Sequence, residues 1–232
     1  MTKAPLSLPD LPGVAVHLRR SARARRFSLR VSRVDGAVTL TLPARAPLAE
    51  ATAFARGQTE WLRATLAQLP AQRRPVFGAL LPFEGVELRL QAAPVAAPRA
   101  EGGLLLLPPG EERLEARLSA FLKHCARVRL QAATERHAAA LGRPFRRITL
   151  RDTRSRWGSC AADGSLSYSW RLIMAPPEVL DYVAAHEVAH LAEMNHSPAF
   201  WAVVARLCPG YAAHRAWLKR HGAGLQAIRL GA

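Results

Sequence analysis

Two histidines four residues apart, with a glutamate between them, constrain the fold of this chain more than any other feature. The segment reads His186-Glu187-Val188-Ala189-His190. An α-helix brings both imidazoles to one face, because residues four apart lie on adjacent turns of a helix. Two such imidazoles can bind one Zn²⁺, and the carboxylate between them lies where it can act on a metal-bound water. The motif therefore predicts a metal-binding helix.

The residues around this motif agree with a helix. A Pro-Pro-Glu run at 176–178 is typical of a helix start, since proline suits the first turn and an acidic side chain suits the positive end of the helix dipole. No Gly or Pro interrupts residues 178–194, so we expect the helix to span them. A Ser-Pro pair at 197–198 then predicts the N-cap of a second helix over residues 199–207.

The residues leave two candidates for a third zinc ligand. His196 lies six residues beyond His190, too far for the same turn, but it reaches the metal if the helix ends near Asn195 and the chain folds back. Glu193 lies three residues beyond His190 on the same helix face. We favour His196, which stands in the short connection between the two predicted helices.

Several short motifs follow one another in the C-terminal half. They are Arg156-Trp157-Gly158-Ser159-Cys160, Ser169-Trp170-Arg171-Leu172-Ile173, Ala175-Pro176-Pro177, Asp181-Tyr182-Val183, Met194-Asn195-His196-Ser197 and Phe200-Trp201. With the histidine motif they make residues 148–218 resemble the YgjP-like metallopeptidases, which are similar to the SprT-like zinc proteases. The resemblance implies that His186, His190 and His196 bind zinc, that Glu187 is the catalytic base, and that the chain hydrolyses peptide bonds in a protein or peptide substrate.

The resemblance also implies how a substrate is held. Zincin-type proteases commonly bind the peptide as an added strand at the edge of a sheet, and here we expect the Ser165–Trp170 region to be that edge. Trp157, Tyr168 and His214 are our candidate substrate-binding residues. The candidates for a donor that stabilises the oxyanion are Arg156, Tyr211, His214 and Arg215.

The hydrophobic pattern predicts an α+β fold with a β-rich N-terminal half. Strands are expected at 14–18, 27–31, 37–42 and within 77–108, with Asp35-Gly36 as a hairpin turn and one helix at 47–69. A long helix at 111–141 ended by Gly142, strands at 148–151 and 166–170, and three final helices complete the chain. We therefore expect a β-rich region over residues 1–110 and a zincin-like metallopeptidase domain over residues 111–232, with the HExxH helix as its active-site helix.

Arginine dominates the charge of the chain, which has 232 residues and a formal net charge of +16. The first cluster is Arg19, Arg20, Arg23, Arg25, Arg26, Arg30 and Arg33, and the second is Arg143, Arg146, Arg147, Arg151, Arg154 and Arg156. Such clusters attract polyanions, so we consider nucleic acid as a partner. The alternative is a solvated basic face without a dedicated partner, because no helix-turn-helix, zinc-finger or aromatic stacking motif accompanies the arginines.

The remaining features favour a cytoplasmic protein that does not cross a membrane. Residues 1–13 lack the apolar run of a secretory signal, and the leucine run at 104–107 is far too short to span a bilayer. Cys125, Cys160 and Cys208 are an odd number at unrelated spacings, which suggests no disulfide framework. Cys160 stands near the predicted site, where it is a nucleophile, a ligand or, as we favour, a small packing residue.

Two other functions remain open from the sequence. In one, the metal is structural and the chain is a zinc-containing nucleic-acid-binding module. In the other, the chain is a scaffold that has the fold without protease activity. A structural zinc site is usually closed by a fourth protein ligand, and Cys208 is the one candidate for it. Glu187 favours catalysis.

Overall fold

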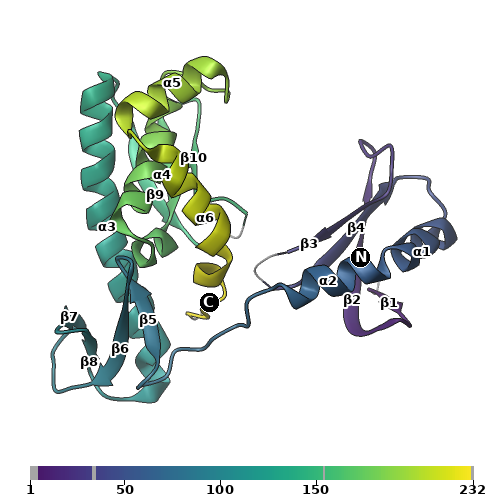
Figure 1. Cartoon of the computed structure of the whole chain (residues 1–232), viewed down its shortest axis with the longest axis horizontal. Helices are drawn as coiled ribbons and strands as arrows, with labels where there is room; N and C mark the ends of the chain where they lie inside the picture. Colours follow the sequence, from purple (N-terminus) through teal and green to yellow (C-terminus); the bar gives the residue numbers. More distant parts are fainter. Residues whose placement is uncertain (1–4, 33–34, 154, 231–232) are drawn as a thin grey trace. The chain divides into compact units, whose positions relative to one another are not determined.

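The computed structural model describes residues 5–32, 35–153 and 155–230, and the chain forms two compact units, Met1–Gln72 and Arg73–Ala232 (Figure 1). The division lies between residues 72 and 73, whereas the sequence predicts it between 110 and 111. Arg33 and Arg154 of the predicted arginine clusters lie outside the described residues.

The first unit is a four-stranded sheet with two helices. Its elements are β1 (Leu6–Leu8), β2 (Leu11–Ser21), β3 (Ser28–Val31), β4 (Val38–Pro43), α1 (Leu48–Gly57) and α2 (Thr59–Ala67). The strand order is β1-β2-β4-β3, with β2 and β4 parallel and the other pairs antiparallel. The predicted hairpin joins β3 to β4, and Gly36 supplies the positive φ of its turn. The predicted helix at 47–69 is two helices that meet at Gln58.

The second unit begins with another four-stranded sheet, of order β5-β6-β8-β7. Its strands are β5 (Leu80–Phe83), β6 (Val86–Ala92), β7 (Arg99–Glu101) and β8 (Leu104–Leu107), and they lead through the 3₁₀ turn η1 (Glu111–Arg113) into the long helix α3 (Leu114–Leu141). Leu81, Leu90 and Leu105 are buried in the same apolar core as the leucines of α3. This shared core is the physical reason why these strands belong to the second unit and not to the first. Gly142 ends α3 in the left-handed conformation, as predicted.

A three-stranded sheet follows α3 and lies beside the predicted site. It consists of β9 (Arg147–Arg151), β10 (Gly158–Cys160) and β11 (Ser165–Ser169), in the order β10-β11-β9. Leu166 and Tyr168 of β11 are buried in the core of the second unit. Because β11 is the central strand, its backbone is paired on both sides. The prediction that the Ser165–Trp170 region offers a free edge is therefore wrong. The edge strands are β10 and β9, and β10 is the one that packs against the helix of the histidine motif.

The remaining helices surround α4 (Pro177–Ala189), which follows the 3₁₀ turn η2 (Trp170–Met174) and carries the histidine motif. It packs against α3, α5 (Pro198–Leu207), α6 (Tyr211–Gln226) and β10. Ala184, Ala185, Val188 and Ala189 are fully buried, so α4 is the central helix of the unit. It ends at Ala189, five residues before the predicted end, and turns lead from there to α5. Among the described residues, no helix combines the length and the apolar character needed to cross a membrane.

Candidate metal centre

Three histidines converge at the C-terminal end of α4. His186 and His190 come from the last turns of the helix and its cap, and His196 comes from the connection to α5. The ligand atoms of all three lie within 4.8 Å of one another, and no other such group of His, Cys, Asp or Glu occurs among the described residues. The third member of the cluster is therefore His196 and not the carboxylate of Glu193.

The spacing of the imidazoles fits a tetrahedral metal ion. The Nε2 atoms of His186 and His196 are 3.2 Å apart. Two ligands at about 2.05 Å from one tetrahedral Zn²⁺ lie about 3.4 Å apart. This separation is close to the observed one, so the two nitrogens stand where a shared ion would bring them.

Capping of α5 holds the loop that carries His196. The Ser197 hydroxyl accepts a hydrogen bond from the backbone N–H of Phe200 (3.3 Å), as the predicted N-cap requires. The Asn195 side chain accepts one from the backbone N–H of Ser197 (3.1 Å). These bonds fix the chain on both sides of His196, which explains how an exposed loop residue keeps its place beside α4.

An aromatic stack supports the His196 ring. Trp201 of α5 stacks on it with ring centres 5.8 Å apart, and Tyr211 stacks on Trp201 at 5.3 Å. The guanidinium of Arg215 lies 4.7 Å from the centre of the Trp201 ring. Tyr211 and Arg215, which the sequence offers as oxyanion donors, thus pack on the tryptophan that supports His196.

The protonation of the imidazoles favours metal binding. Burial lowers the pKa of His186 to about 4, with further lowering by the charges of His190, His196 and Arg215. Burial also lowers the pKa of His190. The Nδ1–H of His190 donates to the carbonyl oxygen of Glu193 (3.0 Å), which leaves Nε2 free to bind a metal. Both imidazoles of α4 are thus neutral near pH 7, the form that binds metal ions.

Glu187 is a buried carboxylate beside the histidines. Its side chain is only 5% exposed, and burial raises its pKa to about 8, with the charge of Arg156 acting in the opposite direction. A Cβ atom on Gly158 of β10 would lie 2.4 Å from Glu187 Oε1. Gly158 therefore leaves the space that this carboxylate occupies. In the sequence Gly158 stands out only as part of a motif, because the contact joins residues 29 positions apart.

The histidines and Glu187 open into a cleft of about 430 Å³ between α4, β10 and the loop before α5. Trp157 lines this cleft and packs on α6, since a Cβ at Gly222 would lie 2.8 Å from the Trp157 ring. Arg156 and Tyr182 also line it. Of the three candidate substrate-binding residues, the structure therefore brings Trp157 to the cleft.

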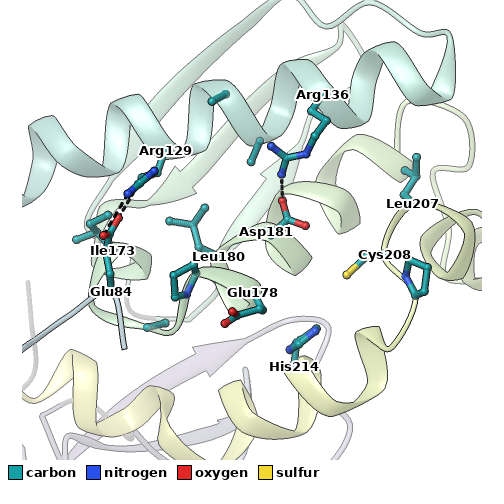
Figure 2. Close-up of a pocket in the computed structure, with 15 residues that line it drawn as sticks. Glu84, Arg129, Arg136, Ile173, Glu178, Leu180, Asp181, Leu207, Cys208 and His214 are labelled. Atoms are coloured by element: carbon teal, nitrogen blue, oxygen red, sulfur yellow. Dashed lines mark hydrogen bonds and ion pairs between the residues drawn. The ribbon is translucent and has the colours of Figure 1, made fainter. Parts of the chain in front are cut away.

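The structure places Tyr168 and His214 elsewhere. Tyr168 is 1% exposed, and its hydroxyl accepts a hydrogen bond from Thr134 of α3 (3.1 Å), so its role in this arrangement is structural. His214 and Cys208 line a separate cavity of about 510 Å³ between α3, α4 and the start of α6 (Figure 2). Cys208 is therefore not a fourth ligand in this arrangement.

Cys160 lies at the cleft without the properties of a nucleophile. Burial raises the pKa of its thiol to about 11, with contributions from the nearby carboxylates of Glu187 and Asp163. A thiol with this pKa is protonated at neutral pH and reacts poorly. Cys160 also packs against the core of the unit, which agrees with the interpretation as a packing residue.

No curated protein matches this chain. The crystal structure of the metallopeptidase zymogen of Pyrococcus abyssi abylysin is similar over 39% of this chain and 93% of that chain, with 21% identity and a TM-score of 0.35. The model of the YgjP-like family, described as its metallopeptidase domain, matches residues 25–221. This match covers most of the chain and confirms the resemblance seen in the sequence: the chain belongs to the YgjP-like family of metallopeptidases.

Proposed function

We propose that the chain is a zinc-dependent peptidase in which His186, His190 and His196 hold the metal and Glu187 is the general base. The observation that carries this proposal is the convergence of three imidazoles beside a buried carboxylate in one cleft. Neutral nitrogen ligands in tetrahedral spacing suit Zn²⁺. No fourth His, Cys, Asp or Glu joins the group among the described residues, and an open coordination position is typical of catalytic zinc sites.

The residues around the site have distinct tasks in this mechanism. Zinc, when bound, lowers the pKa of a coordinated water to about 7 and polarises a carbonyl group. The positive charge of a bound zinc ion would favour the ionised form of Glu187 over the protonated form that burial alone favours. Ionised Glu187 accepts a proton from the attacking water and then donates it to the leaving amine. Gly158 and the buried surroundings of Glu187 hold the carboxylate in one place, so that little reorganisation is needed when the proton moves.

We further propose that the substrate adds to the sheet at β10. The carbonyl oxygen of Trp157 accepts from the Ser169 N–H (2.8 Å), and the Ala161 N–H donates to Ser165 (2.9 Å). In an antiparallel ladder the direction of these bonds alternates from residue to residue. The backbone groups of Gly158 and Cys160 therefore point away from β11, toward the open edge. A peptide strand can pair with them beside the histidines.

Replacing Glu187 tests the mechanism. Glu187→Gln keeps the size of the side chain but cannot accept a proton, so cleavage of an unfolded protein should fall by about 10²–10⁴-fold. The bound zinc should stay near one ion per chain, measured by elemental analysis. Glu178→Gln is the matched control, because Glu178 lies on α4 but lines the other cavity. Unchanged cleavage in Glu187→Gln would refute this mechanism.

For the first unit we propose contact with nucleic acid through its exposed arginines. The observation that favours it is the exposure of all six described arginines of the first cluster. Five of them are Arg19, Arg23, Arg25, Arg26 and Arg30. Arg20 differs from them, because its guanidinium donates to the carbonyl oxygens of Pro43, Ala44 and Ala46 and so has a structural role.

Salt dependence tests this contact. Binding to an oligonucleotide should weaken steeply as salt rises, and joint replacement of Arg23, Arg25 and Arg26 by glutamine should flatten the slope, since fewer counterions are released. If the wild-type chain binds neither DNA nor RNA at low salt, the basic surface of the first unit has no nucleic-acid partner.

We also propose a cytoplasmic location for the protein. Cys125, Cys160 and Cys208 are all free thiols, and thiols stay reduced in that compartment. Mass spectrometry of thiols alkylated in intact cells would test it, and oxidised cysteines would contradict it.

A further inference from the structure

The outer face of the β10-β11-β9 sheet is basic and rich in hydroxyl groups. Side chains alternate along a strand, and the paired residues Thr149, Ser167 and Ser159 cross all three strands on the face opposite the buried Leu166 and Tyr168. On the same face, arginine and hydroxyl side chains line a cavity of about 430 Å³. They include Arg147, Arg151, Arg156, Ser159, Ser165 and Ser167.

Three arginines of this face have no ion-pair partner among the described residues. Arg147, Arg151 and Arg156 are exposed, and none of them forms an ion pair with a described residue. The cavity also contains the carboxylate of Asp163. That carboxylate is already paired with Arg146 and accepts a hydrogen bond from the Ser165 hydroxyl (3.0 Å). Three guanidinium groups beside hydroxyl donors therefore remain for an anionic ligand.

This face is continuous with the metal cleft. Arg156, Gly158 and Ser159 line both cavities. A peptide that pairs with β10 has alternate side chains on the two faces of the extended sheet. The peptide side chains that pair with Gly158 and Cys160 face α4. The peptide side chain that pairs with Ser159 projects over the outer face, as do the peptide side chains two residues before and two residues after it. An added strand lies about 14 Å from β9, three strand spacings, and a long acidic side chain and an arginine together cover that distance.

The composition of the face distinguishes two kinds of polyanion. Proteins that bind single-stranded nucleic acid combine positive charge with aromatic side chains on which bases stack. No aromatic residue is among the described residues that line this cavity. Carboxylates need no such platform, since guanidinium and hydroxyl groups satisfy them. The lining therefore favours an acidic peptide over a single-stranded nucleic acid held by base stacking.

We propose that the outer face of the β10-β11-β9 sheet is a specificity subsite that selects protein substrates with Asp or Glu at alternate positions near the scissile bond. This inference rests on the proposed peptidase function and adds the class of substrate to it. Arg156 is the nearest of the three guanidiniums to the edge strand in sequence, and Arg147 and Arg151 extend the positive field across the sheet.

Peptide binding tests the subsite independently of cleavage. Fluorescence anisotropy is measured for two labelled peptides of equal length, one alternating Thr and Glu and the other alternating Thr and Gln. The full chain carries Glu187→Gln, so that the peptide is not consumed. We expect the Glu peptide to bind about fivefold more tightly at low salt, since exposed ion pairs are individually weak, and the difference should shrink as salt screens the charges.

Two double variants with the same loss of charge sharpen this test. Arg147→Gln with Arg151→Gln should remove most of the preference for the Glu peptide. Arg206→Gln with Arg220→Gln should retain it, because these exposed arginines of α5 and α6 do not line the cavity. Equal affinity for both peptides, or a preference that survives the first double variant, would overturn the subsite.

Two further measurements distinguish an acidic-peptide subsite from a nucleic-acid site and from a failure of the peptidase proposal. If a single-stranded oligonucleotide binds through Arg147 and Arg151 while the Glu peptide shows no advantage, the face binds nucleic acid and the peptide subsite is wrong. The wild-type chain with zinc is also assayed for cleavage of both peptides. Cleavage without a preference for Glu refutes the subsite alone. A binding preference without any cleavage supports the subsite and refutes the peptidase proposal.

Discussion

Replacing Gly158 with alanine tests whether Glu187 is held where the structure places it. The added Cβ would lie 2.4 Å from Oε1, 2.6 Å from Cγ and 2.7 Å from Cδ of Glu187. The backbone at Gly158 does not have the positive φ that only glycine adopts readily, so the substitution acts through space and not through backbone strain. Glu187 is 5% exposed and cannot move freely into solvent. Either the carboxylate or strand β10 must therefore shift.

The structure allows the size of the effect to be worked out. Overpacking a close contact costs about 1–3 kcal/mol, and alanine recovers about 0.5–1 kcal/mol of the conformational entropy that glycine loses on folding. The free energy of unfolding should thus fall by about 0–2.5 kcal/mol. For a domain of the size of residues 73–232, each kcal/mol corresponds to about 2–4 °C in Tm. A general base displaced by about 1 Å costs on the order of 10²-fold in rate.

The assay combines thermal unfolding, zinc content and cleavage of an unfolded protein. Gly158→Ala should lose about 100-fold in cleavage and keep its zinc, because the contact does not involve the histidines. Gly224→Ala is the control, since nothing lies within 4 Å of its added Cβ on α6. It should gain up to about 1 kcal/mol of stability and cleave normally. Gly158→Ala with wild-type stability and activity would show that Glu187 does not occupy this space.

Three further predictions concern the ligands, the buried tyrosine and a charged helix residue. His196→Ala should lose most of the bound zinc, while Glu193→Ala should keep it. The opposite result in a metal assay would make Glu193 the third ligand in place of His196. Tyr168→Phe should leave cleavage unchanged and cost about 1–2 kcal/mol in chemical unfolding, because Thr134 loses its acceptor; a loss of activity at wild-type stability would instead place the tyrosine at the substrate. Burial alone would raise the pKa of Asp181, but its histidine and arginine partners bring it below the ordinary value. The ionised Asp181 carboxylate therefore stabilises the fold above about pH 4, and this contribution is lost as the pH falls through the lower folded pKa. Asp181→Asn should reduce the loss of stability at acid pH, measured by unfolding at a series of pH values. An unchanged pH profile of stability would contradict this prediction.

Local signals in the sequence were sufficient for the elements that carry the site. The spacing of His186 and His190 predicts a helix, Ser197 caps the next one through a bond three residues away, and Gly142 ends α3 in a conformation that glycine favours. These features depend on residues within one or two turns of each other. The family resemblance also followed from the sequence alone, because its motifs are short and contiguous, and the family match confirms it.

Long-range packing decided what the sequence could not. Strands β5–β8 belong with α3 because their leucines share its core, and an apolar strand sequence does not say which core will bury it. The central place of β11 follows from its pairing with β9 and β10 on its two sides, which leaves these two strands at the edges. Tyr168 and His214 lie outside the cleft for the same reason. Tyr168 is hydrogen-bonded to Thr134 of α3, and His214 lines the separate cavity. Such contacts join residues far apart in the chain, and only the folded arrangement of the second unit brings them together.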